Sequence, residues 1–166
     1  MALIEDGRVV ADRWRWLADG EPLPAAGAVI LPYERWLADR PRPAPGLQLG
    51  TTLPAGKLAS TLAESLADLS LVAVGFAKFR DGRGFSAARE LRERYGFEGE
   101  IRAVGHLVAD QYVFLHRCGF STVTIEREQD APTWAAALSS FTVAYQAAAE
   151  GDRPLSQLRR RIGTGR

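Results

Sequence analysis

Residues 71–95 read LVAVGFAKFRDGRGFSAARELRERY, and this stretch predicts the fold. Its first part, residues 71–77, is a continuous apolar run, which is typical of a strand buried on both faces of a parallel sheet. A helical pattern starts near Ser86 and places Ala88 and Leu91 on one side. Opposite charges four residues apart cover the other sides, as expected for a helix surface in water. The stretch is therefore a β/α unit with a polar turn between its strand and its helix.

The same alternation is expected before and after this unit. Further strands are predicted over residues 47–53, 100–105 and 122–125. Helical patterns follow them over residues 58–69, over about 107–118 with Gly119 at the end, and from Pro132 onward. Such alternation predicts parallel strands with right-handed crossovers. We expect an α/β protein of about four β/α units whose parallel sheet is either open or a half-barrel.

The N-terminal part has a different pattern, with short strand candidates separated by prolines. A strand is expected near residues 9–16, another over 28–31, and a helical turn from Pro32. Trp14, Trp16 and Trp36 are interpreted as packing anchors rather than as stacking platforms for nucleic acid.

These N-terminal strands would lie at an edge of the sheet or be exchanged with a partner chain. A half-barrel exposes its edges, so we expect a homodimer. The chain then divides into N-terminal strands and Pro-rich connectors packed on the core (residues 1–46), a β/α core (47–150) and a polar, basic tail (151–166).

Composition excludes several function classes. The formal net charge of the 166 residues is +1, which argues against binding to nucleic acid or to a membrane surface. Cys118 is the single cysteine and falls in the last turn of a predicted helix, where a packed, inert thiol is expected. His106 and His116 lack a metal-site spacing, so no metal is expected. No signal peptide or membrane-spanning run is recognisable, so the cytoplasm is the expected compartment.

The loops that follow parallel strands share one rim of the sheet, where α/β proteins bind ligands. The loop after residues 71–77 would bring Lys78, Arg80, Asp81 and Arg83 to that rim. The next two loops would add His106, Asp110, Gln111, Glu126 and Arg127. Two arginines beside a helix N-terminus can bind an oxyanion through forked hydrogen bonds and free N–H groups.

We therefore predict an anion or substrate site formed by Arg80, Asp81, Gly82, Arg83, Gly84, Ser86, His106, Asp110 and Gln111. Asp81 and Asp110 are the candidate catalytic groups, should there be a reaction. A purely structural alternative stays open, in which Asp81 pairs with a neighbouring arginine in a tight turn and Ser86 caps the helix. Gln111 is expected to point inward, on the helical face that carries Phe114 and Cys118.

No cofactor is predicted. Residues 82–87 fit a loose G-x-G-x-x-A dinucleotide pattern. Four polar or bulky residues, however, separate that pattern from its strand, and no acid ends the strand near residue 105, where a ribose would require one.

Four segments together resemble a known family. They are DGRGFSAARELR (residues 81–92), GEIRAVG (99–105), the pair Asp110-Gln111 and RCGF (117–120). The chain resembles the bacterial family called domain of unknown function 934, most weakly before residue 28 and after residue 130. The resemblance implies an accessory protein or oxidoreductase of assimilatory sulfite reduction, with sulfite reductase as the partner, and it supplies no catalytic residues. Ala77-Lys78 departs from the proline-containing stretch expected before the motif.

We therefore expect an accessory or anion-binding protein of sulfur assimilation with no redox centre of its own. Its loops 78–86 and 105–111 would bind sulfite reductase, a small oxyanion or an adenosine nucleotide. Two alternatives remain: an enzyme acting on an anionic sulfur- or phosphate-bearing small molecule, and a structural dimeric interaction protein.

Overall fold

The computed structural model describes residues 1–78 and 80–139. Its strands are β1 (Ala2–Glu5), β2 (Arg8–Val10), β3 (Trp14–Trp16), β4 (Gly27–Leu31), β5 (Leu47–Leu53), β6 (Leu71–Phe76), β7 (Glu100–Gly105) and β8 (Thr122–Ile125). Its helices are α1 (Tyr33–Asp39), α2 (Arg83–Glu93), α3 (Tyr112–Arg117) and α4 (Ala131–Ser139), with the 3₁₀ segments η1 (Ala59–Asp68), η2 (Ala109–Gln111) and η3 (Glu128–Asp130).

All eight strands form one sheet in the order β2-β1-β8-β7-β6-β5-β4-β3. Neighbouring strands from β3 to β8 are parallel, and β1 joins β8 in the antiparallel direction. The α/β fold with a parallel sheet is thus confirmed, with six parallel strands where about four were expected. The N-terminal strands lie at the two edges of the chain's own sheet.

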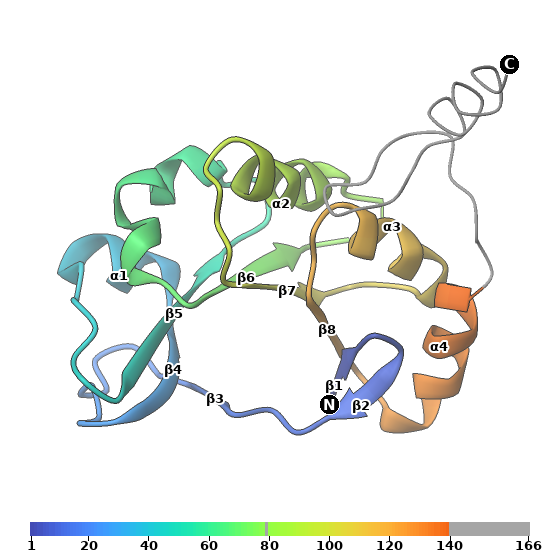
Figure 1. The fold of residues 1–166 in the computed structure, drawn as a ribbon, viewed down its shortest axis with the longest axis horizontal. Coiled ribbons are helices and arrows are strands. Elements are labelled where there is room, and N and C mark those ends of the chain that lie inside the picture. The colour runs from blue at the N-terminus through green and yellow to red at the C-terminus, as the bar shows by residue number, and fades with distance from the viewer. Residues whose placement is uncertain (79, 140–166) are drawn as a thin grey trace, which may run out of the picture.

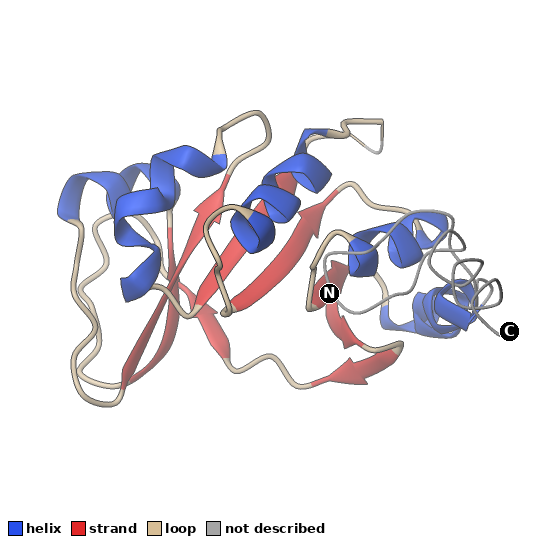
Figure 2. Cartoon of the chain, turned by 45° about the horizontal axis from the view of Figure 1, so that its top comes forward, coloured by secondary structure: helices blue, strands red, loops and turns tan. Residues whose placement is uncertain are grey.

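The helices α1, α2 and α3 lie on one side of the sheet (Figure 1), and Figure 2 shows the strands in red beneath this layer. The main core fills the space between them, because alternate strand residues such as Val72, Val74 and Ile101 point toward the helices. A smaller apolar cluster of Trp14, Ile30, Leu71 and Ala73 occupies the opposite face.

The sheet is strongly curled into a half-barrel. The indole N–H of Trp14, on the edge strand β3, donates a 3.0 Å hydrogen bond to Glu100 on β7. In a flat sheet these two strands would lie about 19 Å apart, four times the usual strand spacing. Only three residues, Ala11 to Arg13, connect the opposite edge strands β2 and β3. This connection runs along the lower side of the sheet, away from the helices (Figure 1).

Several predicted elements differ in detail. Helix α2 begins at Arg83 rather than near Ser86. The predicted helix over 107–118 is the short segment η2 followed by α3. Trp14 and Trp36 are buried as expected, whereas Trp16 is 45% exposed and is not a packing anchor.

The helix predicted from Pro132 onward corresponds to α4, in which Trp134 is buried. Residues 140–166, which include the basic tail, lie outside the described residues. Within the described part, no helix has the length and apolar character needed to cross a bilayer.

Candidate functional site

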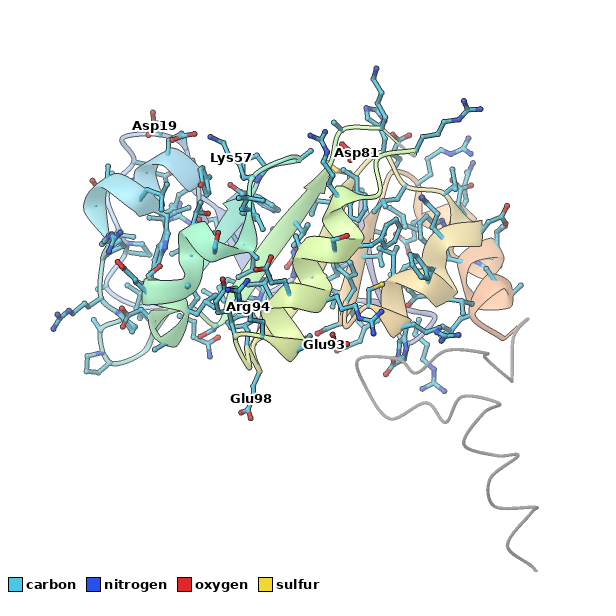
Figure 3. All side chains as sticks on the ribbon, turned by 90° about the horizontal axis from the view of Figure 1, so that it is seen from above. Asp19, Lys57, Asp81, Glu93, Arg94 and Glu98 are labelled. Atoms are coloured by element: carbon cyan, nitrogen blue, oxygen red, sulfur yellow. The ribbon has the colours of Figure 1, made fainter. Side chains whose placement is uncertain are left out.

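The loops predicted to carry the site lie on one rim of the half-barrel, at the carboxyl ends of the parallel strands. Lys57, in the loop after β5, and Asp81, in the loop after β6, lie along the same edge of the molecule in Figure 3, whereas Glu93 and Glu98 lie at the opposite edge. The backbone N–H of His106, after β7, donates to the carbonyl of Phe76 at the end of β6, over 3.0 Å. The predicted loops 78–86 and 105–111 therefore share this rim.

Asp81 and Arg83 form a bidentate ion pair on the rim. The Nε and Nη2 atoms of Arg83 donate to the two carboxylate oxygens of Asp81 over 2.8 and 2.6 Å. The side-chain hydrogen bonds from Arg83, followed by the hydrogen bond from its backbone N–H, lower the pKa of Asp81 to about 2. The structural alternative for Asp81 is thus observed. The side chain of Arg83 nevertheless stays 68% exposed, whereas that of Asp81 is 13% exposed, so the arginine rather than the carboxylate faces solvent.

Asp81 also occupies the start of helix α2. Its Oδ1 accepts a hydrogen bond from the backbone N–H of Arg83 over 3.2 Å, because Gly82 at the N-cap has no side chain to do so. Ser86 lies inside the first turn and is exposed, so it does not cap the helix as the structural alternative required. Gly84 is buried against the ring of Phe76 and leaves no room for a larger residue, since a Cβ there would lie 2.6 Å from that ring. Asp81 therefore supplies the cap for which Ser86 was considered.

The second loop contributes mainly polar turn residues. His106 and Asp110 are exposed, and Asp110 lies in the first turn of η2. Gln111 does not point inward with Phe114 as predicted: its Oε1 accepts a hydrogen bond from the backbone N–H of Val108 over 3.2 Å. Phe114 is 53% exposed, with its ring 4.7 Å from that of Phe85. The helix is shorter than expected, so its inward face differs from the predicted one.

Cations gather on the two neighbouring loops after β5 and β6. Lys78, Arg80 and Arg83 are exposed, and so is Lys57, which was not predicted as a site residue. The guanidinium of Arg83 lies against Gly56, since a Cβ added there would be 2.7 Å from its Nη1 atom. The turn residues Pro54 and Gly56 after a predicted strand are the sequence signal that places Lys57 on this rim.

The third loop is more acidic. Arg127, predicted at the rim, forms an ion pair with Asp130 over 3.0 Å, and Glu126 beside it is exposed. The exposed positive charge of the rim is therefore concentrated on the loops after β5 and β6 rather than on the loop after β8.

Sequence reasoning missed a second polar cluster, inside the curled sheet at the opposite ends of the strands. Arg102 on β7 has a side chain that is only 1% exposed, and it bonds to both Asp12 and Glu100. Trp14 and Thr122 donate further hydrogen bonds to Glu100 over 3.0 and 2.6 Å. The signal available in the sequence was Arg102 between apolar neighbours in a strand, at a position that faces away from the helices.

The cluster has a structural role. Asp12 lies on the connection between the two edge strands, so its ion pair with Arg102 holds that connection across the curled sheet. Burial raises the pKa of Asp12, but the hydrogen bonds from Arg102 and from the N–H of Trp14 lower it more, so the net pKa lies below the ordinary value. The carboxylate form of Asp12 is thus stabilised by the fold.

The remaining reactive side chains offer no metal or nucleophile site in the described part of the chain. No group of three His, Cys, Asp or Glu side chains there could hold a metal ion. Cys118 is buried, and burial raises the pKa of its thiol, which disfavours the thiolate.

The fold and the rim define an α/β half-barrel protein with cations on its carboxyl-terminal loops. Its sequence matches a described family, bacterial proteins of unknown function (DUF934), over residues 50–156. The chain belongs to this family, and the match begins within β5 and covers β6 to β8 with the rim loops that follow these strands. No curated protein matches the chain.

Proposed function

We propose that this protein binds an oxyanion or an anionic partner surface at its carboxyl-terminal rim and serves as an accessory protein of assimilatory sulfite reduction, with no redox centre of its own. The observation that carries the proposal is the grouping of Lys57, Lys78, Arg80 and Arg83 as exposed residues on two neighbouring rim loops. The family resemblance supplies the connection with sulfite reduction.

The Asp81–Arg83 pair supports binding through preorganisation. Asp81 holds the guanidinium through Nε and Nη2, while Nη1 lies against the backbone at Gly56. A guanidinium that is already oriented loses less conformational entropy when an anion binds. Lys57, whose Nζ lies 3.6 Å from a carboxylate oxygen of Glu34, stands on the adjacent loop and would supply the second charge.

Acid–base catalysis by Asp81 has less support. A carboxylate with a pKa of about 2 is fully ionised near neutral pH and is a weak proton acceptor. The geometry therefore favours a role in orienting Arg83. The alternative of an enzyme acting on an anionic small molecule would have to rely on Asp110, which is exposed at the start of η2.

The small-molecule part of the proposal is tested by thermal unfolding with sulfate, phosphate, sulfite or AMP at constant ionic strength. At a ligand concentration ten times Kd, the melting temperature is expected to rise by roughly 3–6 °C. Sulfate also stabilises proteins without specific binding, so the variants decide. Arg83→Ala and Lys57→Ala are expected to lose the specific part of the shift, whereas Arg94→Ala, which breaks an exposed pair with Glu90 at the other end of helix α2, keeps it. Equal shifts in all four proteins would refute anion binding at the rim.

The partner is tested by sedimentation of the protein with purified sulfite reductase. We expect a complex that weakens with added salt and is lost in Arg83→Glu, because exposed charges are screened. The same experiment gives the oligomeric state, for which a homodimer is proposed. A complex unaffected by Arg83→Glu would place the contact elsewhere, and absence of a complex at low salt would refute the accessory role.

A further inference from the structure

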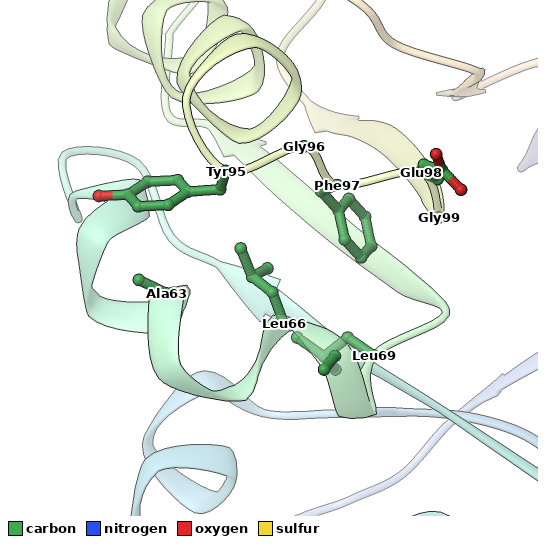
Figure 4. Close-up of a pocket in the computed structure, with 9 residues that line it drawn as sticks. Ala63, Leu66, Leu69, Tyr95, Gly96, Phe97, Glu98 and Gly99 are labelled. Carbon is green, nitrogen blue, oxygen red and sulfur yellow. The ribbon is translucent and has the colours of Figure 1, made fainter.

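A groove lies at the opposite end of the molecule from the rim, between η1 and the connection from α2 to β7 (Figure 4). Its volume is about 500 Å³. One wall is formed by η1 and the residue after it, with Leu66 and Leu69, and the other by residues 95–99, with Tyr95 and Phe97. Its side chains are mostly apolar or aromatic, but Leu66, Leu69 and Phe97 are buried, and polar atoms form about half of the exposed surface. A lining that combines both kinds of surface fits an occupant with both apolar and polar groups.

The wall formed by residues 95–99 is held in place by Arg92. The Nη1 atom of Arg92 donates to the carbonyls of Phe97 and Gly99 over 2.5 and 2.7 Å, and its Nε donates to the carbonyl of Gly119 over 3.0 Å. Three backbone carbonyls are thus fixed by one side chain. The groove is therefore formed before any occupant binds, which lowers the entropic penalty of binding.

The surroundings of the groove are acidic. Glu98 lines it, and Glu64 and Asp68 lie on η1 beside it. Glu64 pairs with Arg40 over 2.9 Å, but among residues 1–78 and 80–139 no ion pair forms to Asp68 or Glu98. A groove of mixed polarity with two carboxylates at its border favours an occupant that carries positive charges beside apolar side chains.

We propose that the groove is the docking site for the basic stretch of this chain at residues 153–162. Their sequence, which lies outside the described residues, is RPLSQLRRRI. It combines four arginines with Leu155, Leu158 and Ile162, whose i, i+3, i+7 spacing is that of segments that bind grooves through one apolar face. The leucines fill the space beside Leu66 and Phe97, and the arginines meet the carboxylates at the border.

The segment between Ser139 and the basic stretch tethers that stretch to the domain, which favours the contact within one chain. The described residues end at Ser139, and the 16 residues from there to Leu155 can span up to about 54 Å. A compact domain of the described length has a radius of gyration of about 14 Å, so the stretch can reach the groove on its own molecule. Attachment by such a tether gives an effective concentration in the millimolar range, so a weak contact suffices.

Disulfide trapping in the full-length chain tests the proposal. In a Cys118→Ser background, Ala67→Cys on the groove is combined with Leu158→Cys, and Ala77→Cys on the opposite rim serves as the matched control, since both alanines are exposed. Under oxidised glutathione, the bond within one chain is expected to form at least tenfold faster for the groove pair. A tenfold excess of a synthetic peptide of residues 153–164 should slow formation of the disulfide bond. Changing each of Arg159, Arg160 and Arg161 to Glu should slow it as well.

Each other outcome overturns the proposal. Equal rates for the two cysteine pairs would mean that the groove has no preference for the stretch. Bonds between chains rather than within one would identify a second copy as the occupant. Insensitivity to the peptide and to the charge reversal would mean that the cysteines meet by random collision. Circular dichroism of each variant confirms that it is folded, and none of these results depends on anion binding at the rim.

Discussion

Replacing Arg102 by methionine should destabilise the protein strongly. The guanidinium makes four hydrogen bonds to carboxylate oxygens, two to Asp12 and two to Glu100, over 2.7–3.0 Å. Methionine keeps an unbranched side chain of similar length but removes the charge and every donor. Two carboxylates are then left facing each other inside the curled sheet, without a cation.

The size of the expected loss of stability follows from how deeply the ion pair is buried. Breaking a buried ion pair by removing one partner costs about 3–5 kcal/mol, because the remaining charge stays desolvated. The side chain of Arg102 is 1% exposed, but that of Asp12 is 35% exposed and can relax toward water. We therefore expect a loss near the lower end, about 3 kcal/mol of unfolding free energy. For a domain of this size that corresponds to a fall in melting temperature of roughly 6–12 °C.

Urea unfolding followed by tryptophan fluorescence measures this loss. Arg15→Met is the control, since Arg15 forms an exposed pair with Glu21 and such pairs contribute about 0–1 kcal/mol. Adding Glu100→Gln to Arg102→Met should recover part of the stability, because the unpaired charge is gone. Trp14 and Thr122 donate to different oxygens of Glu100, so the single amide oxygen can accept from Trp14 while the amide N–H donates to the hydroxyl of Thr122. A loss for Arg102→Met no larger than that for Arg15→Met, or no recovery in the double variant, would refute the argument.

Three further predictions concern Asp81, Gly84 and Cys118. The carboxyl carbon of Asp81 should titrate in NMR with a pKa of about 2. Because the folded pKa is depressed, the stabilising effect of the Asp81–Arg83 pair is complete above about pH 4 and is lost as the pH falls toward 2. An unchanged titration of Asp81 in Arg83→Gln would contradict the assigned cause. Gly84→Ala should cost about 1–3 kcal/mol in urea unfolding, since its Cβ would meet the ring of buried Phe76 at 2.6 Å, whereas Gly82→Ala, with nothing within 4 Å, should be neutral or stabilising. Cys118 should react with a thiol reagent such as DTNB only on unfolding, because burial raises the pKa of its thiol; a reaction as fast as that of free cysteine would show that the site opens.

The strands that could be predicted from sequence are those buried on both faces. Strands β5, β7 and β8 have the predicted bounds, and β6 ends one residue earlier than expected. Continuous apolar or β-branched runs bounded by glycine and proline make such strands recognisable. Strand β3, by contrast, has three residues, of which only Trp14 is buried. A strand of three residues shows no recognisable periodicity. The number of parallel strands was therefore predicted as about four instead of six.

The sequence predicted a sheet that is either open or a half-barrel and could not decide between them, because the curl depends on partners far apart in the chain. Asp12 and Arg102 are 90 residues apart, and Trp14 and Glu100 are 86 apart. Local patterns report only on neighbours within a few residues. The rim, in contrast, follows from a topological rule, since loops after parallel strands must share one edge. The sequence therefore predicted which loops share one rim better than it described the shape of the sheet.

The two arginine–carboxylate groups differ in whether another anion can enter them. Arg102 is enclosed, and an incoming anion would have to displace carboxylates that cannot leave the interior. Arg83 bonds to one carboxylate, that of Asp81, and its own side chain stays 68% exposed, so water or another anion can reach the guanidinium. In the proposed function, an oxyanion would add to the exposed side of Arg83 while Asp81 keeps the guanidinium oriented, and Lys57 would supply a second cation. The same side-chain chemistry is thus enclosed and structural at one end of the half-barrel and exposed at the other, where we propose that an anion binds.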